Sequence, residues 1–251
     1  MSINRMKKVQ TTLSKWGVDA FVVTDPIDLY YLSGIKLSLG TIVVSKNKTA
    51  LIVDSRYFEK CQKEASLPVL LAGPGVVGKE LSGYSSVGFA SENLTYSAYL
   101  KLQAEVSGTL VALEYPMQQI RAIKEASEVA ALEKAISLCY KGFDFVISRL
   151  HEGVTEESVA KDLQIYWLTH GADGLSFDSI IAFGKNSSMP HYRAGSTTLK
   201  AHDIVLVDIG VVVDGYASDM TRSFFFGKPD ARLEEIYDIV LAAQEQSIES
   251  V

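Results

Sequence analysis

The stretch "VLVDIGVVVDGYASDMTRSF", residues 205–224, has the pattern of two β-strands joined by a tight turn. Asp214 and Gly215 supply the turn, because a two-residue hairpin loop needs positive φ at both positions and this pair tolerates it. Each strand carries one aspartate, Asp208 and Asp219, among apolar or small residues. The sequence thus places two carboxylates in its most strand-like part, and a physical reason for them is needed.

The length of the loop decides how the two aspartates are arranged. With a two-residue loop, Val213 pairs with Tyr216 and Asp208 pairs with Thr221. Asp219 is then the diagonal neighbour of Asp208 on the same face, with the two backbones about 7–8 Å apart. A four-residue loop would place the aspartates directly opposite each other, and only a loop of odd length would put them on different faces.

Two carboxylates this close repel each other, so either one is protonated or a cation lies between them. The alternative is that this face is the solvated side of an antiparallel sheet. Leu206, Ala217 and Thr221 flank the aspartates on this face, and no lysine or arginine does, which favours a bound cation. Oxygen ligands without thiolate suit Mn²⁺, Mg²⁺ or Co²⁺, and Zn²⁺ is also compatible.

A third candidate is His191, in "NSSMPHYRAG" (186–195). The preceding Pro190 biases the local chain towards an extended or turn conformation, and catalytic groups are often held in loops. The alternative is a solvent-facing loop histidine, which is the commoner case for a histidine considered singly.

Composition narrows the class of protein. The 251 residues are 47% hydrophobic and 22% charged, an ordinary globular balance that is long enough for two modest domains. A net charge of -6 argues against a nucleic-acid partner. No apolar run approaches the ~18 residues of a membrane helix. With two cysteines and no signal-peptide pattern, the sequence predicts a cytoplasmic, reduced protein.

The chain divides into two parts of different character. Its first ~115 residues alternate helical and strand patterns, with a hairpin over 41–54, and predict an α/β domain with a mixed sheet. Met6, Val9 and Leu13 form the apolar stripe of a first helix, and Ser55 is placed as the cap of a later one. We therefore predict an N-terminal domain over residues 1–118 and a second domain over 119–251.

The second part begins with a long amphipathic helix from Glu125. Thr155 is the predicted cap of the next helix, where Glu156 and Glu157 suit the positive end of the helix dipole. After Gly171 the pattern changes to strands, and a last helix follows Asp230.

Four further stretches, taken with the hairpin, resemble one family. The hairpin is similar to the first metal-ligand block of the pita-bread metallopeptidases, aminopeptidase P and prolidase, which reads D-x-G, then G-Y, then S-D-x-T-R. The other stretches that resemble this family are "IRAIKEASEVAALEKA" (120–135), "SFDSIIAFGKNSSMPH" (176–191), "DPIDLYYLSG" (25–34) and "DSRYFEKC" (54–61). The resemblance implies an α/β creatinase/prolidase-type N-terminal domain followed by the first half of an α+β pita-bread catalytic domain.

The resemblance also implies roles for the candidate residues. Asp208 matches a ligand of one metal ion, Asp219 matches a carboxylate that bridges two ions, and His191 matches a histidine that contacts the substrate and steadies the tetrahedral intermediate. The implied reaction is hydrolysis of the Xaa-Pro bond at the N-terminus of peptides or in dipeptides, with two Mn²⁺ ions or with Co²⁺ or Zn²⁺. A proline-containing peptide is the implied partner, and a homodimer is the implied assembly.

The sequence departs from the family in one respect. The family's remaining ligands, a histidine and two glutamates, have no match: Glu234, Glu235, Glu245 and Glu249 lie in the last predicted helix. We therefore expect a chain truncated within the catalytic domain and inactive by itself. The alternatives are a metal-free peptide- or protein-binding module and a creatinase-like amidinohydrolase, and both aspartates argue against each. Aminopeptidase P and prolidase are not distinguished.

Overall fold

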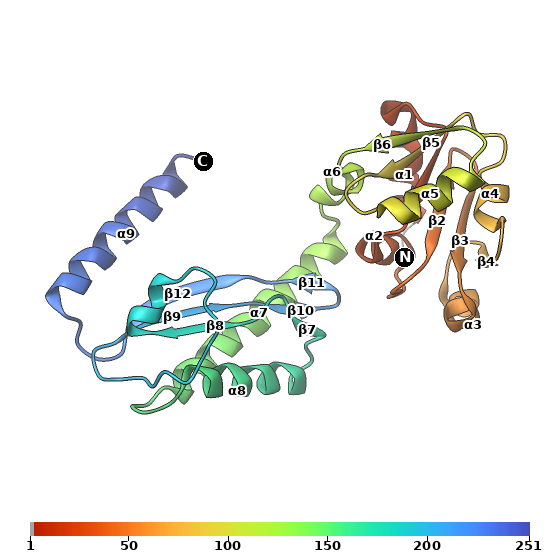
Figure 1. Ribbon diagram of the computed structural model, residues 1–251. Helices are drawn as coiled ribbons and strands as arrows, with labels where there is room; N and C mark the ends of the chain where they lie inside the picture. The colour runs from red at the N-terminus through yellow and green to blue at the C-terminus, as the bar shows by residue number, and fades with distance from the viewer. Residues whose placement is uncertain (1–2) are drawn as a thin grey trace. The chain divides into compact units, whose positions relative to one another are not determined.

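The computed structural model of the protein describes residues 3–251 (Figure 1). The chain divides into two compact units, and the division falls between Ile123 and Lys124. The domain boundary that the sequence places between residues 118 and 119 stays a prediction.

The first unit is built on a six-stranded sheet with the strand order β4-β3-β2-β1-β5-β6. Its strands are β1 (Ala20–Val23), β2 (Thr41–Ser45), β3 (Thr49–Val53), β4 (Val69–Leu71), β5 (Ser86–Ala90) and β6 (Thr109–Leu113). β2 pairs antiparallel with β1 and with β3, and the other pairs are parallel. The predicted mixed sheet and the predicted hairpin over 41–54 are both confirmed.

Both faces of this sheet are covered. The helices of the unit are α1 (Ile3–Trp16), α2 (Pro26–Ser33), α3 (Ser55–Glu64), α4 (Val76–Glu80), α5 (Tyr96–Glu105) and α6 (Pro116–Ala122). In β1, Phe21 and Val23 belong to one apolar cluster and Ala20 and Val22 to another. Alternate residues of a strand point to opposite faces, so this strand is buried on both sides.

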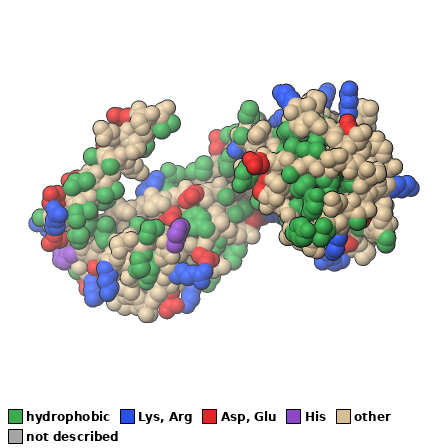
Figure 2. Space-filling view, turned by 45° about the horizontal axis from the view of Figure 1, so that its top comes forward, with side chains coloured by type: hydrophobic (Ala, Val, Ile, Leu, Met, Phe, Trp, Pro, Cys, Tyr) green, Lys and Arg blue, Asp and Glu red, His purple; other side chains and the backbone are tan. Residues whose placement is uncertain are grey.

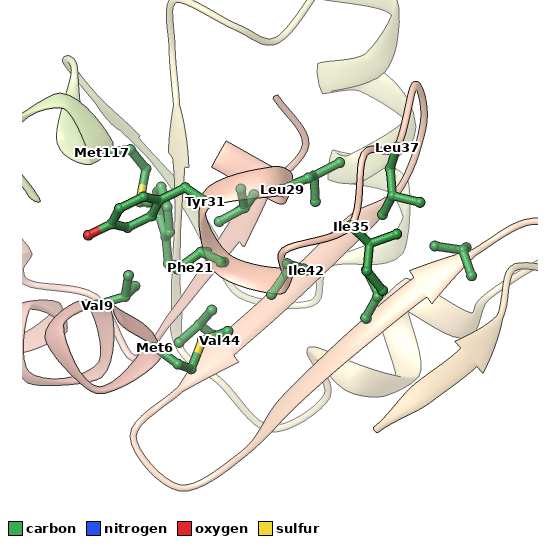
Figure 3. Close-up of a cluster of buried hydrophobic side chains, with 14 of the residues drawn as sticks. Met6, Val9, Phe21, Leu29, Tyr31, Ile35, Leu37, Ile42, Val44 and Met117 are labelled. Atoms are coloured by element: carbon green, nitrogen blue, oxygen red, sulfur yellow. The ribbon is translucent and has the colours of Figure 1, made fainter. Parts of the chain in front are cut away.

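The predicted stripe of α1 is confirmed, because Met6, Val9 and Leu13 are all buried in the larger cluster. Figure 3 shows Met6 beside Val44 of β2. The helix ends at Gly17, whose φ of 69° is in the left-handed region that glycine tolerates without strain.

One predicted helix cap was wrong by one residue. Asp54, and not Ser55, caps α3: its carboxylate accepts a hydrogen bond from the backbone N–H of Arg56 at 2.9 Å, and Ser55 is the first helical residue. Both side chains are able to cap a helix, so residue type alone did not separate them.

The second unit contains two three-stranded sheets, in the orders β11-β10-β7 and β12-β9-β8. Its strands are β7 (Gly174–Leu175), β8 (Ile180–Phe183), β9 (Ile204–Ile209), β10 (Val211–Val213), β11 (Tyr216–Ala217) and β12 (Met220–Phe225). β9 and β10 are separated by Gly210 alone and pair antiparallel with β12 and β11 respectively. The four strands are therefore one long ribbon that belongs to both sheets.

Two long helices bury one face of this ribbon. The helical elements of the unit are α7 (Ala126–Arg149), α8 (Glu156–Thr169), the 3-10 helix η1 (Gly184–Ser188) and α9 (Ala231–Glu249). Val205, Val207 and Ile209 of β9 are fully buried in one cluster with Trp167 of α8 and Val146 of α7. The residues between them, on the other face, are only partly buried.

The ends of these helices agree with the sequence. The long helix predicted from Glu125 is α7, and Glu125 is its cap. The Thr155 hydroxyl caps α8 by accepting from the N–H of Ser158, and Asp230 caps α9 by accepting from the N–H of Arg232. Within residues 3–251, no helix combines the length and the apolar character needed to cross a membrane.

Candidate active site

The ribbon over residues 204–225 has the register that its sequence predicts. Val213 pairs with Tyr216, and Asp208 pairs with Thr221. Asp214 has a φ of 52° and Gly215 a φ of 79°, as a two-residue loop with positive φ at both positions requires. The prediction of a two-residue loop is confirmed.

This register puts the two aspartates on one face of the ribbon. Met220 pairs with Ile209, so Asp219 lies opposite Gly210 and diagonal to Asp208. Asp208 is half-buried and Asp219 is exposed. The Oδ1 atom of Asp208 accepts a hydrogen bond from the hydroxyl of Thr221 at 2.8 Å, which fixes the orientation of this carboxylate.

A cavity of about 380 Å³ lies over this face of the ribbon. It is lined by Phe177, Asp178, Ile180, His191, Tyr192, Arg193, Asp208 and Asp219. All three residues singled out from the sequence, two on the ribbon and one on the loop before it, therefore border the same cavity. Their chemical roles stay predictions.

Five of the lining residues were not found by sequence reasoning. Ile180 reaches the cavity because β8 pairs with β9, with Ile180 directly beside Asp208. Phe177 and Asp178 precede this strand, and Tyr192 and Arg193 follow His191 in the chain. Proximity along the sequence to His191 was the available signal for the last two.

One cation does border the cavity. The strand neighbours of the aspartates include no lysine or arginine on their face, as the sequence predicts, but Arg193 enters from the loop. Its Nη2 atom is 3.6 Å from Oδ2 of Asp178, and both side chains are largely exposed. An ion pair this exposed is screened by water, so it does little to neutralise the other two carboxylates.

The two aspartates carry the type of ligand atom that divalent cations prefer, but the number of such ligands is small. Asp208 and Asp219 offer carboxylate oxygens, the ligands that hard divalent ions prefer. Among residues 3–251, no group of three or more histidine, cysteine, aspartate or glutamate side chains is placed to hold a metal ion. Two aspartates alone are thus too few donors for a complete metal site.

The loop that carries His191 is anchored from inside the unit. The hydroxyl of Tyr192 donates to Oε2 of Glu156 at 2.6 Å, and this hydrogen bond raises the pKa of Tyr192. Sequence reasoning treated Glu156 as a residue that suits a helix N-terminus, yet its side chain is fully buried. Burial of this carboxylate depends on the path of a distant loop, which no local sequence pattern indicates.

The charged side chains elsewhere on this unit are mixed in sign. Figure 2 shows acidic, basic and histidine side chains interspersed on the viewed face of the second unit.

An α/β unit that precedes helices packed on a carboxylate-bearing β-ribbon defines the class of two-domain pita-bread proteins. Residues 5–123 match the creatinase/prolidase N-terminal domain, and residues 130–251 match metallopeptidase family M24. The chain belongs to metallopeptidase family M24 and carries a creatinase/prolidase N-terminal domain before the first half of the catalytic fold.

Individual relatives agree with this assignment. An uncharacterized peptidase of Bacillus subtilis, YqhT, is 31% identical over 247 residues, which cover 96% of this chain and 70% of the relative. The Xaa-Pro dipeptidase of Pyrococcus horikoshii is 30% identical over 250 residues, 98% of this chain and 71% of the relative. The structure of an Xaa-Pro dipeptidase from Bacillus anthracis superposes with a TM-score of 0.91 at 28% identity, over 97% of this chain and 70% of that one.

Proposed function

We propose that the chain supplies part of the active site of an Xaa-Pro peptidase, with Asp208 and Asp219 as metal ligands. The observation that carries the proposal is that both carboxylates lie on one face of the ribbon and border one cavity with His191. The names of relatives at about 30% identity support the substrate class, because one is an Xaa-Pro dipeptidase. Mn²⁺ is the proposed ion, with Co²⁺ and Zn²⁺ as alternatives, because carboxylates discriminate poorly among these metals.

Five of the eight residues that line the cavity have a role in this proposal. Asp208 and Asp219 would be the ligands that hold the divalent ions, with Asp219 shared between two, and the bound metal would supply Lewis-acid chemistry for peptide hydrolysis. His191 contacts the scissile carbonyl of the substrate, where a ring N–H is able to donate a hydrogen bond as negative charge develops on the oxygen. Phe177 and Ile180 give the cavity an apolar side, which suits a proline ring.

The proposal extends to the behaviour of these 251 residues by themselves. Two carboxylates without a third ligand bind a divalent ion weakly, since affinity rises with the number of charged ligands. We therefore propose that the chain alone holds no ion tightly and does not hydrolyse peptides. We also propose a cytoplasmic location, which the small number of cysteines supports. We propose a homodimer as well, which the family resemblance supports.

The test is release of proline from the dipeptide Ala-Pro in the presence of Mn²⁺. Two proteins are compared: the 251-residue chain, and the chain extended by about 100 residues of downstream coding sequence, the size needed to complete a domain. We expect hydrolysis only by the extended protein, with loss of activity on chelation and in Asp219→Asn. Asp214→Asn, which changes an exposed aspartate at the tip of the same hairpin, is the control and should keep activity.

The other outcomes distinguish the alternatives. Turnover by the 251-residue chain would contradict its proposed inactivity, and hydrolysis that survives Asp219→Asn would contradict the metal role. An extended protein that binds Ala-Pro equally with and without metal, and never cleaves it, would be a peptide-binding module. Hydrolysis of creatine in place of Ala-Pro would identify a creatinase-like amidinohydrolase.

A further inference from the structure

Glu156, the first residue of α8, is a charged side chain that the proposed mechanism does not use. It is fully buried. An ionised carboxylate is costly to remove from water unless several donors replace its hydration. The hydrogen-bond donors that surround Glu156 therefore indicate the role of its carboxylate.

Four donors reach this carboxylate, two to each oxygen. The Oε1 atom accepts from the backbone N–H of Phe183 at 2.7 Å and from the side-chain amide of Asn186 at 2.9 Å. The Oε2 atom accepts from the hydroxyl of Tyr192 at 2.6 Å and from the backbone N–H of Gly195 at 3.2 Å. One oxygen thus holds the start of the segment 183–195 and the other holds its end.

His191 lies inside the segment that these bonds close. Between η1 and β9 the chain has no helix or strand longer than a single bridge residue, so regular secondary structure does not fix its path. Asn186 links further parts of this segment, because its side-chain amide nitrogen also lies 2.9 Å from the Tyr192 hydroxyl and 3.0 Å from Oγ1 of Thr197. Tyr192, the chain neighbour of His191, is therefore held from the inside while His191 borders the cavity.

We propose that Glu156 is the positioning residue of the active-site loop, and that its four hydrogen bonds hold His191 at the cavity. The contribution of this inference to catalysis rests on the proposed function of His191. The anchoring itself does not, because it is a property of the 251-residue chain. The carboxylate suits this task because it accepts at both oxygens, whereas an amide would present a donor to donors at one of them.

The substitution that tests this is Glu156→Gln, which preserves shape and removes one acceptor atom. Glu157→Gln is the matched control: it makes the same change one residue along α8, where the side chain is partly exposed and pairs with Lys161 at 2.8 Å. The readout is the set of backbone order parameters for residues 189–193, measured by ¹⁵N relaxation on the 251-residue chain. The ¹³C order parameter of the His191 ring is measured in parallel.

We expect order parameters of about 0.85 in the wild type and in Glu157→Gln, and below about 0.6 in Glu156→Gln. Thermal unfolding is recorded beside them, because a purely structural role would lower the melting temperature without loosening this segment in the folded protein. A folded Glu156→Gln chain whose segment stays as rigid as the wild type would overturn the proposal.

A second variant keeps the proposal testable where Glu156→Gln does not fold. Tyr192→Phe removes one donor and buries no new polar atom, and we expect order parameters between those of the wild type and the flexible range. A rigid segment in Tyr192→Phe, combined with unfolding of Glu156→Gln, would show that Glu156 only stabilises the unit, and would overturn the proposal. Mn²⁺ affinity, which tests the proposed function separately, should change less than about twofold in Glu157→Gln, because the ligands lie on the ribbon.

Discussion

Substitution of Gly210 by alanine should disturb the ribbon at the point where the two aspartates lie. Gly210 is opposite Asp219 and two residues from Asp208 on the same face. A Cβ atom added at Gly210 would lie 2.3 Å from the carbonyl oxygen of Ser218 and 2.8 Å from the ring of Phe177. The closer of these atoms is backbone, so the ribbon itself has to move.

The cost follows from what holds that carbonyl in place. The oxygen of Ser218 accepts from the hydroxyl of Ser176 at 2.9 Å, and the N–H of Ser176 donates to the carbonyl of Gly210 at 3.0 Å. Overpacking costs about 1–3 kcal/mol, and loss of one hydrogen bond adds about 1 kcal/mol. We therefore expect Gly210→Ala to lower the free energy of unfolding of the second unit by about 2–4 kcal/mol.

The assay is urea unfolding followed by tryptophan fluorescence. The chain has two tryptophans, so a Trp16→Phe background leaves Trp167, which is fully buried in the second unit, as the only reporter. Gly174→Ala is the control, because it lies in β7 of the neighbouring sheet and an added Cβ meets nothing within 4 Å. It should change the free energy by less than about 1 kcal/mol. Equal stability of the two variants would refute the close-approach argument.

Three other predictions concern the protonation and packing of buried groups. Burial raises the pKa of Asp28 from 3.8 to about 6, so its contribution to stability is complete below pH 3.8 and is lost as the pH rises through 6. In urea titrations, the free energy of unfolding of Asp28→Asn relative to the wild type should rise by up to about 3 kcal/mol between pH 4 and pH 7, and a difference that is constant with pH would contradict this. Glu156→Gln should lower the pKa of Tyr192 towards its ordinary value, measured by ¹³C NMR of the phenol carbon, and an unchanged pKa would show that another group raises it. Gly142→Ala should lower the free energy of unfolding by about 1–3 kcal/mol in the same fluorescence assay, because its Cβ would lie 2.3 Å from Nε1 of Trp167; a cost below about 0.5 kcal/mol would show that the helices separate easily.

Local patterns were enough to predict much of the fold. The Asp214-Gly215 turn fixed the register of the ribbon, and this register placed Asp208 and Asp219 on one face without any knowledge of the rest of the unit. The caps Thr155 and Asp230 were equally readable, because a cap acts on N–H groups two or three residues away. These features depend on neighbours in the chain.

The features that sequence reasoning missed depend on distant neighbours. Glu156 resembles a surface residue of a helix N-terminus until the segment 183–195 folds over it. Phe177 lies close before β8, which pairs with β9 of the ribbon, and Arg193 lies in the loop that carries His191; both border the cavity. No periodicity or spacing encodes such contacts, which are set by the path of the chain through the whole unit.

The most direct test of the central claim is Mn²⁺ binding to the 251-residue chain, measured by the electron paramagnetic resonance signal of the free ion. We expect weak binding, with a dissociation constant of about 0.1–1 mM, typical of sites with few charged ligands. Binding should be lost in Asp208→Asn and in Asp219→Asn and kept in Asp214→Asn, which leaves the cavity unchanged. Mn²⁺ binding of equal strength in all three variants would contradict the claim that this carboxylate pair holds the ion.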